Sequence, residues 1–316
     1  MQRQPNAAGL SSRAASVDLS AHRHLYPFES HWLDIQGHRY HYVDEGAGEP
    51  VILVHGNPTW SFFFRGLITE LRASYRVIAV DHIGCGCSDK PGDDDYEYCL
   101  ERRVADLDAL VEHLHLGDNL TFGVHDWGGM IGLATALRRA QRVKRLVIFN
   151  TAAFGLPSGT TLPLRLWIVR NLIPLATPLV RGLNAFSYLA TRMACVTRMS
   201  SDVSKAYRAP YDSWANRIAT LRFVQDIPLK ESDPAYPIMK ETGEGLIRLA
   251  DKPMLICWGL KDFVFGRQFL DEWVRRFPTA DVHRFEDSGH YVLEDAGEEI
   301  IPLVRRFIAR QMDHSA

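Results

Sequence analysis

One carboxylate, Asp126, stands where the sequence could place a nucleophile. It follows residues 120–124, an apolar run with the composition of a buried strand, and it precedes residues 127–138, where apolar side chains recur at helical spacing. A sharp strand-to-helix turn pushes the side chain at its apex outward, and the free N–H groups at a helix start favour an ionised carboxylate. Gly128 and Gly129 leave room for so tight a turn. The alternative for this window is an Asp that only caps the helix.

Two further residues with acid–base chemistry follow later strands. Asp262 comes just after the apolar residues 253–259, and His290 follows the strand-like residues 281–285. Because functional side chains in open parallel sheets gather at the carboxyl ends of the strands, we expect His290 to reach Asp126 and Asp262 to orient His290. An ionised Asp needs no proton removed before it attacks. His290 would then act later, as a neutral imidazole that activates water or manages a proton.

Asn57 and Trp127 are the candidate donors for a leaving anion. Asn57 follows the apolar residues 51–54, so its side-chain amide could face the same point as the backbone N–H of Trp127. The Trp127 indole adds an N–H that needs no acceptor of its own. A simple turn at Asn57 and a packing role for Trp127 are the alternatives.

The elements that must position these residues alternate along the chain. Residues 32–44 predict a hairpin of two edge strands, residues 51–54, 77–80, 120–124 and 145–150 predict buried strands, and residues 62–73, 106–116 and 127–138 predict helices. Wholly apolar strands separated by helices indicate a parallel sheet that is covered on both faces.

The alternation stops at residue 151 and resumes near residue 253. Between them, helical segments are separated by prolines, and no strand pattern is evident. The predicted fold class is therefore α/β, a mostly parallel, doubly wound sheet with an inserted helical cap. We divide the chain into an irregular N-terminal arm (1–29), a core (30–150 and 238–316) and the cap (151–237), which would cover a ligand site at the strand ends.

Composition excludes several classes of function. The 316 residues include 36 basic and 38 acidic side chains, which gives no bias toward nucleic acid. The five cysteines are scattered, and Cys85 and Cys87 lie too close for a zinc pair, so the prediction is free thiols with no metal and no cofactor. The first thirty residues lack the apolar centre of a secretory signal, and residues 162–189 are broken by arginines and prolines. We expect a cytoplasmic protein without a transmembrane segment.

The motifs resemble a known enzyme family. His55-Gly56-Asn57-Pro58-Thr59-Trp60, His125-Asp126-Trp127-Gly128-Gly129 and the late Asp262 and His290 look like the haloalkane dehalogenase branch of the α/β-hydrolases, over nearly the whole chain. The resemblance implies an α/β-hydrolase fold, Asp126 as the nucleophile, Asn57 and Trp127 as the leaving-group site, and His290 with Asp262 as the acid–base pair. Other dehalogenases place a Glu after the preceding strand, where this chain has Asn150.

Longer stretches look like one subgroup of that branch. Residues 81–91, 209–217, 223–229 and 258–265 are similar to the β-lactone decarboxylases of bacterial long-chain olefin biosynthesis. The resemblance implies conversion of a cis-β-lactone with two long alkyl chains into a cis-alkene and carbon dioxide, a hydrophobic small-molecule substrate, and work beside a β-lactone synthetase and a reductase. Attack on the lactone carbonyl and attack on the ring carbon that bears oxygen both stay open.

Three alternatives remain at this stage. A haloalkane dehalogenase that hydrolyses alkyl halides through an alkyl-Asp ester would differ only in what its cavity admits. Epoxide hydrolases also use an Asp nucleophile with cap tyrosines as acids, for which Tyr188, Tyr207, Tyr211 and Tyr236 are candidates. A non-catalytic binding protein would not need Asp126, Asp262 and His290 together.

Overall fold

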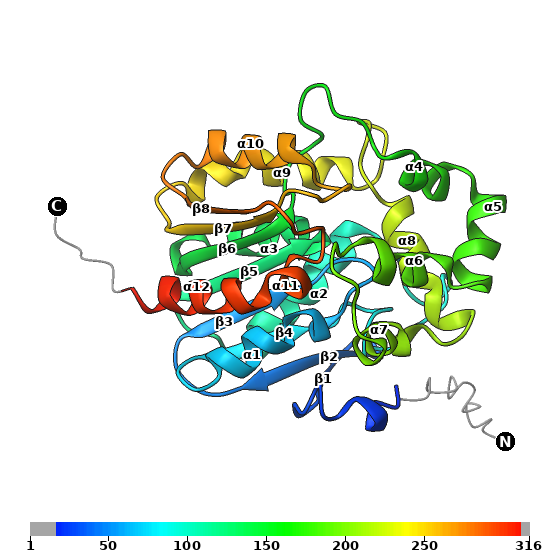
Figure 1. The fold of residues 1–316 in the computed structure, drawn as a ribbon, viewed down its shortest axis with the longest axis horizontal. Coiled ribbons are helices and arrows are strands. Elements are labelled where there is room, and N and C mark those ends of the chain that lie inside the picture. The colour runs from blue at the N-terminus through cyan, green and yellow to red at the C-terminus, as the bar shows by residue number, and fades with distance from the viewer. Residues whose placement is uncertain (1–16, 311–316) are drawn as a thin grey trace, which may run out of the picture.

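The computed structural model describes residues 17–310 and contains an eight-stranded sheet in the order β1-β2-β4-β3-β5-β6-β7-β8 (Figure 1). The strands are β1 (His31–Ile35), β2 (His38–Glu45), β3 (Pro50–Val54), β4 (Arg76–Val80), β5 (Leu120–Asp126), β6 (Val143–Thr151), β7 (Met254–Gly259) and β8 (Asp281–Phe285). The β1–β2 and β2–β4 pairs are antiparallel, and every later pair is parallel. The predicted edge hairpin and the mostly parallel sheet are confirmed.

Two apolar layers cover the sheet because successive side chains of each central strand point to opposite faces. In β3, Ile52 and Val54 belong to one core cluster, whereas Val51 and Leu53 belong to the other. The first cluster is closed by α2 (Leu100–His113), α3 (Trp127–Leu137), α9 (Tyr236–Gly245) and α10 (Arg267–Arg276), and the second by α1 (Arg65–Leu71) and α12 (Gly297–Ala309). Burial on both faces explains why these strands have no polar alternation.

Five helices lie together beyond the sheet, between β6 and β7 in sequence (Figure 1). They are α4 (Leu164–Asn171), α5 (Ile173–Thr177), α6 (Ala185–Met193), α7 (Ser201–Arg208) and α8 (Ile218–Gln225). We call this group the cap helices. The short helix α11 (Val292–Asp295) follows His290. Among the described residues, no helix has both the length and the apolar character needed to cross a membrane.

The main difference from the sequence prediction is the start of α2, which begins at Leu100 and not at Asp106. The first turns carry charges and give no apolar helical pattern. Arg103 is nevertheless 1% exposed and pairs with Asp226 at 3.1 Å, and Asp106 pairs with Arg102. Ion pairing lets charged residues occupy a buried face, which a hydrophobic pattern does not reveal. Of the predicted arm, residues 1–16 lie outside the described part.

Candidate active site

Asp126 occupies a strained turn between β5 and α3. Its backbone φ is +53°, in the left-handed region that a non-glycine residue seldom adopts. Gly128 permits this turn, because a Cβ on that residue would lie 1.9 Å from the carbonyl oxygen of Val54 on the neighbouring strand. The predicted tight turn from strand to helix is confirmed.

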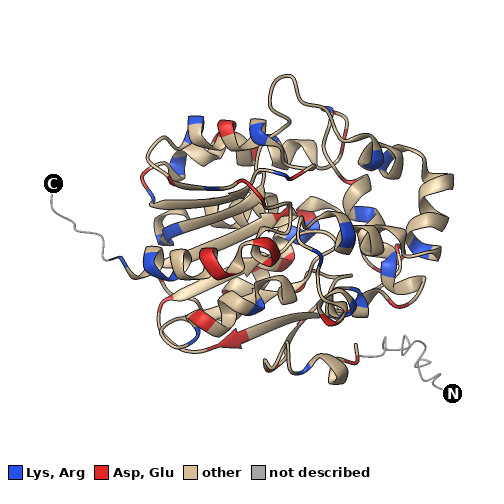
Figure 2. Ribbon diagram, in the orientation of Figure 1, with Lys and Arg blue, Asp and Glu red and all other residues tan. Residues whose placement is uncertain are grey.

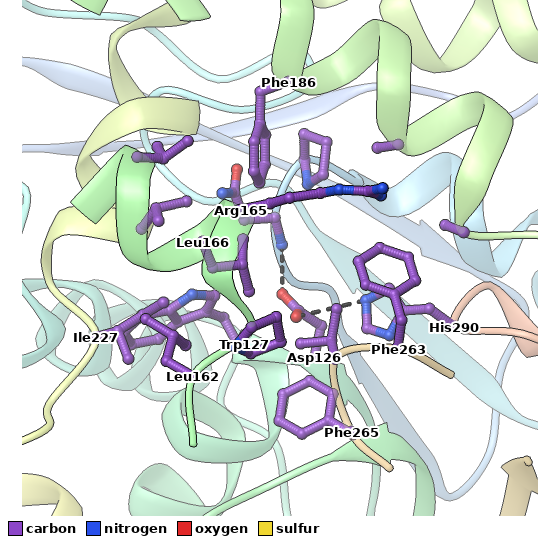
Figure 3. Close-up of a pocket in the computed structure, with 18 of the residues that line it drawn as sticks. Asp126, Trp127, Leu162, Arg165, Leu166, Phe186, Ile227, Phe263, Phe265 and His290 are labelled. Atoms are coloured by element: carbon purple, nitrogen blue, oxygen red, sulfur yellow. Dashed lines mark hydrogen bonds and ion pairs between the residues drawn. The ribbon is translucent and has the colours of Figure 1, made fainter. Parts of the chain in front are cut away.

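The side chain of Asp126 does not cap α3, so the helix-cap alternative is wrong. Its Oδ1 accepts a hydrogen bond from the backbone N–H of Asn57 at 2.6 Å, and its Oδ2 lies 3.5 Å from Nε2 of His290 (Figure 3). Asp126 also lines a cavity beneath the cap helices. The turn therefore holds the carboxylate away from its own helix and presents it to the cavity.

His290 lies between two carboxylates, as the sequence predicted. Its Nδ1 is 2.8 Å from Oδ2 of Asp262, and its Nε2 faces Asp126 on the other side. The other oxygen of Asp262 accepts the backbone N–H of Val264 at 2.6 Å. These contacts fix the imidazole ring between the nucleophile candidate and Asp262.

Asn150, at the end of β6, supports Asp262 in a way that the sequence analysis did not find. Its side-chain nitrogen donates to Oδ2 of Asp262 at 2.9 Å, and its side-chain oxygen accepts the backbone N–H of Gly259 at 2.8 Å. Asn150 is thus linked to His290 through Asp262. Its position after a buried strand was the available signal, but its partner comes from β7, more than a hundred residues later.

The two carboxylates control the charge of the site. Burial opposes a charged imidazole, but Asp262 and Asp126 outweigh it and raise the pKa of His290 to about 10. Burial likewise opposes a charged carboxylate, but His290 and the backbone N–H of Asn57 hold the pKa of Asp126 below its usual value. Before any substrate reacts, Asp126 is therefore an anion and His290 a cation. The expected neutral imidazole concerns the later covalent intermediate, in which Asp126 is no longer an anion, and it stays a prediction.

Two aromatic rings pack around His290 and keep it in place. Phe265 stacks on its ring with centroids 5.8 Å apart, and His125 lies on the other side at 4.7 Å. Burial, with His290 nearby, lowers the pKa of His125 to about 3, so the His125 ring is neutral. Its Nε2 is 2.9 Å from the carbonyl oxygen of His290, where the N–H form of that nitrogen donates.

The two candidate donors for a leaving anion differ. The Trp127 side chain makes no hydrogen bond within residues 17–310 and lines the cavity, so its indole N–H is free to donate. Asn57 also lines the cavity, but its side-chain nitrogen already donates to the carbonyl oxygen of Thr220 on α8 at 3.0 Å. One hydrogen of this side-chain amide remains free to donate to a ligand. The backbone N–H of Asn57 is not free, because it donates to Asp126.

The cavity measures about 350 Å³ and lies between the strand ends and the cap helices (Figure 3). Most of the side chains that line it are apolar; they include Leu162, Leu166, Val169, Phe186, Leu189, Ile227, Phe263 and Phe269. Besides Asp126, His290 and the donors beside them, Arg165 and Thr161 also line the cavity. Of the four tyrosines considered as acids, none lines it, and the Tyr207 and Tyr211 hydroxyls bond Glu294 and the Thr59 carbonyl. This arrangement speaks against the epoxide hydrolase alternative.

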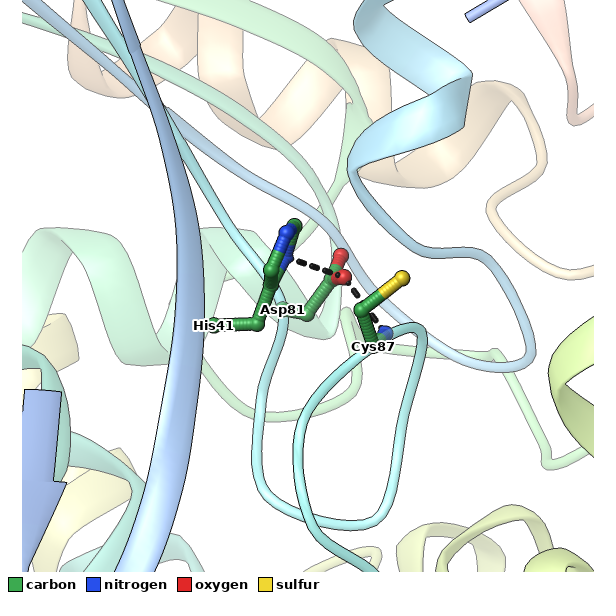
Figure 4. Close-up of side chains that lie close together, drawn as sticks. All are labelled: His41, Asp81 and Cys87. Atoms are coloured by element: carbon green, nitrogen blue, oxygen red, sulfur yellow. Dashed lines mark hydrogen bonds and ion pairs between the residues drawn. The ribbon is translucent and has the colours of Figure 1, made fainter. Parts of the chain in front are cut away.

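A second buried group outside the cavity consists of His41, Asp81 and Cys87, which we call the sealed cluster (Figure 4). Oδ2 of Asp81 lies 2.8 Å from His41 Nδ1 and accepts the Cys87 backbone N–H at 2.8 Å. Its other oxygen accepts the Ser61 backbone N–H at 2.7 Å. Both oxygens are thus already used in holding the chain together, and none of the three residues lines the cavity.

Comparison with known proteins places the chain among enzymes. The family model described as alpha/beta hydrolase fold matches residues 49–297. A cis-3-alkyl-4-alkyloxetan-2-one decarboxylase of Shewanella oneidensis is 52% identical, over 90% of this chain and 89% of the relative. A Xanthomonas campestris protein of the same name is 44% identical, over 90% of this chain and 97% of that protein. The crystal structure of a haloalkane dehalogenase from Agrobacterium tumefaciens matches with a TM-score of 0.81 and 25% identity, over 92% of this chain and 99% of that one.

Proposed function

The chain belongs to the alpha/beta hydrolase family, and within it we propose that it is a β-lactone decarboxylase that converts cis-3,4-dialkyl-oxetan-2-ones into cis-alkenes and carbon dioxide. The observation that carries the proposal is an ionised, buried nucleophile, Asp126, beside a cationic His290 in a cavity with mostly apolar walls. The similarity to two decarboxylases over about nine-tenths of the chain supports the choice of substrate class.

In the first step, an oxygen of Asp126 attacks C4, the alkyl-bearing ring carbon next to the ring oxygen. The C4–O bond breaks, and its electron pair remains on the ring oxygen, which becomes part of a free carboxylate on C3. The indole N–H of Trp127 and the remaining amide hydrogen of Asn57 are the donors available for this new anion. No proton moves, which suits a nucleophile that is already ionised.

In the second step, the bond between C3 and the carboxylate carbon breaks and carbon dioxide leaves. The released electron pair forms the C3=C4 double bond, and the C4–O bond to Asp126 breaks, which returns the carboxylate. Inversion at C4 followed by an antiperiplanar elimination preserves the cis relationship of the alkyl chains. Attack on the carbonyl would instead leave oxygen on C4 and require its later loss as water, so atom balance favours attack on C4.

The walls of the cavity favour this second step. A carboxylate in an apolar cavity is poorly solvated, and decarboxylation transfers its charge to Asp126, where the Asn57 N–H and His290 receive it. While Asp126 is esterified, His290 has only Asp262 as a partner, so the pKa of His290 falls in the intermediate and recovers on product release.

Haloalkane dehalogenation is the second candidate, because the free Trp127 indole N–H suits a halide and a solved dehalogenase shares the fold. That reaction hydrolyses an alkyl ester of Asp126, so it needs water and a neutral His290 in the intermediate. A decarboxylation needs neither.

The test compares the two substrates with one enzyme preparation. A synthetic cis-3,4-dialkyl β-lactone and a 1-bromoalkane of similar length are incubated with the protein, and alkene, carbon dioxide and bromide are quantified. We expect cis-alkene and carbon dioxide in equal amounts, with bromide release slower by a factor of at least about 100. Bromide release without alkene from the lactone would establish the dehalogenase instead.

The proposal also includes the location of the enzyme and the enzymes that act beside it. The resemblance to enzymes of olefin biosynthesis supports a cytoplasmic enzyme that works beside a β-lactone synthetase and a reductase, because a reactive, water-insoluble lactone must come from a preceding ring-closing step. The substrate is a hydrophobic small molecule, in keeping with the apolar cavity walls. No cofactor takes part in the steps above.

A further inference from the structure

Several large apolar side chains on α4, α5, α6 and the segment between α5 and α6 are exposed to solvent. Leu164 is 70% exposed, Ile173 52% and Leu183 73%, and the other large exposed side chains there are Trp167, Leu172, Leu175, Leu179, Tyr188 and Leu189. We call these nine residues the cap surface. Residues 171–175 form an exposed run of five, four of them apolar. Scattered exposed leucines are ordinary, but a contiguous group marks an interaction surface.

The inner face of the same helices already packs against other apolar residues of the protein. Ala176 and Val180 point inward into a small cluster with Leu221 of α8, which Val169 and Phe186 extend. A surface helix normally turns a polar face outward, whereas α5 presents Ile173 and Leu175 to solvent as well. The outward apolar side chains therefore have no partner within residues 17–310.

The charge of the cap surface has one sign. No Asp or Glu occurs from residue 127 to residue 201, whereas residues 151–201 contain five arginines (Figure 2). Arg170 is neutralised by Asp233 at 2.7 Å. Arg165 lines the cavity and donates from its Nη1 to the sulfur of Met193 at 3.4 Å. The other three, Arg181, Arg192 and Arg198, form no ion pair with a carboxylate of the described residues. The cap surface thus combines aliphatic side chains with unpaired cations.

We propose that the cap surface docks on an anionic lipid bilayer. Most of the aliphatic side chains of the cap surface belong to α5 and the segments that flank it, and α5 lies at the outer edge of the molecule (Figure 1). The aromatic residues Trp167 and Tyr188 and the arginines belong to the same stretch of chain. In bilayers, aliphatic groups enter the acyl region, Trp and Tyr lie at the interface, and arginines reach anionic headgroups. A protein partner would be expected to anchor on aromatic and arginine residues more than on leucines. The proposal does not depend on the reaction.

The cap surface is continuous with the wall of the cavity. Leu179 and Leu189 are exposed on the cap surface and also line the cavity that contains Asp126. An apolar molecule dissolved in the bilayer would thus contact two leucines that also line the cavity of Asp126. Docking would place the entrance of the cavity against the membrane, where a long-chain compound concentrates.

Vesicle flotation with the full chain tests the proposal. Vesicles of phosphatidylglycerol with phosphatidylcholine should carry the protein, and phosphatidylcholine vesicles should carry less. The double variant Ile173→Asp/Leu175→Asp should lower the partition coefficient at least tenfold, since each change removes about one buried side chain. Arg192→Gln/Arg198→Gln should lower binding to anionic vesicles by about fivefold per arginine and leave binding to neutral vesicles unchanged.

The matched control is Ile247→Asp. Ile247 is 74% exposed, but its neighbour Arg248 donates to the carbonyl of Leu137, at the end of α3 that lies away from Asp126. This variant should bind vesicles like the wild type. Ile173 and Leu175 do not line the cavity, so turnover of a short-chain soluble substrate verifies that the double variant is folded.

Three results would overturn the proposal. They are the absence of wild-type binding to anionic vesicles, an equal loss of binding in Ile247→Asp, and self-association in sedimentation velocity that the double variant abolishes. The last result would mean that the cap surface binds a second copy of the chain and not a bilayer.

Discussion

Two buried groups in this molecule pair a histidine with a carboxylate, and only one is built for chemistry. In the sealed cluster, Asp81 lies against His41, and each of its two oxygens accepts a hydrogen bond from a backbone N–H group. At the candidate active site, Asp126 has one backbone N–H and His290, and it faces the cavity. Each carboxylate stays ionised, because burial is outweighed by the neighbouring donors and the pKa falls.

The comparison teaches that a shifted pKa at a buried residue does not by itself indicate catalysis. Asp81, in the segment after β4, contacts His41 of β2 and the turn at Ser61, so its charge stabilises the packing of these segments. Asp126 keeps part of its hydrogen-bonding capacity free and reaches the cavity, so its charge is available to a ligand. Access to the cavity, more than burial or charge, separates the two groups.

The largest expected effect is on turnover, from Asp126→Asn. Asn has the same shape as Asp and keeps an oxygen that can accept the Asn57 N–H, so the fold should persist. Removal of the nucleophile should lower kcat for a β-lactone by a factor of about 10⁴, with the free energy of unfolding changed by no more than about 1 kcal/mol. Product assays and urea denaturation measure the two quantities. Normal turnover in this variant would remove the covalent step from the account.

The same substitution at the sealed cluster should act on stability. Asp81→Asn leaves the fully buried His41 without its anionic partner and weakens the bonds from Ser61 and Cys87. We expect the free energy of unfolding to fall by about 3 kcal/mol, while kcat of the folded fraction stays within about twofold. If Asp81→Asn instead abolished turnover in a stable protein, the distinction between the two groups would be wrong.

Titration of His290 gives a smaller but direct test. Its folded pKa of about 10 lies above the unfolded value of about 6.5, so its contribution to stability is complete below pH 6.5 and is lost as pH rises through 10. Nitrogen NMR of the imidazole should therefore show a cation from pH 6 to pH 9. In Asp262→Asn the pKa should fall, because one carboxylate is removed. A neutral ring at pH 8 in the wild type would contradict the charge assignment.

The smallest effect should come from Cys87→Ala. The thiol of Cys87 is not the group that holds Asp81, since the backbone N–H makes that bond and remains in the variant. Stability and turnover should therefore stay within about 0.5 kcal/mol and twofold of the wild type. Added zinc should leave the melting temperature of either protein unchanged. A zinc-dependent rise in Tm that Cys87→Ala removes would make the sealed cluster a metal site.

Much of this organisation was predictable, for reasons that particular residues make clear. The strands at 51–54 and 120–124 are apolar throughout because both faces are covered, and Asp262 and His290 stand directly after later strands. Whether a residue follows a strand can be read from the local sequence. In a parallel sheet the ends of the strands lie at the same edge, so residues that follow different strands come close together. The sheet and the meeting of Asp126, Asp262 and His290 followed from these signals.

What could not be predicted depends on partners that are distant in sequence. The side-chain amide of Asn57 donates to the carbonyl oxygen of Thr220, 163 residues away. The side-chain amide of Asn150, at the end of β6, donates to Asp262, which follows the neighbouring strand β7. Arg103, in the first turn of α2, can be buried because it pairs with Asp226, which directly follows α8. The exposure of Ile173 and Leu175 also needed the structure, because an apolar helix has the same sequence whether its outer face is covered or not.

The fate of the lactone ring oxygen tests the central claim most directly. A cis-3,4-dialkyl β-lactone with ¹⁸O in the ring is turned over in unlabelled water, and the carbon dioxide and water are analysed by mass spectrometry. Attack of Asp126 on C4 leaves the ring oxygen in the carboxylate, so all of the label should leave as singly labelled carbon dioxide. Label in water would mean that the oxygen stayed on C4, and it would contradict the mechanism proposed for Asp126.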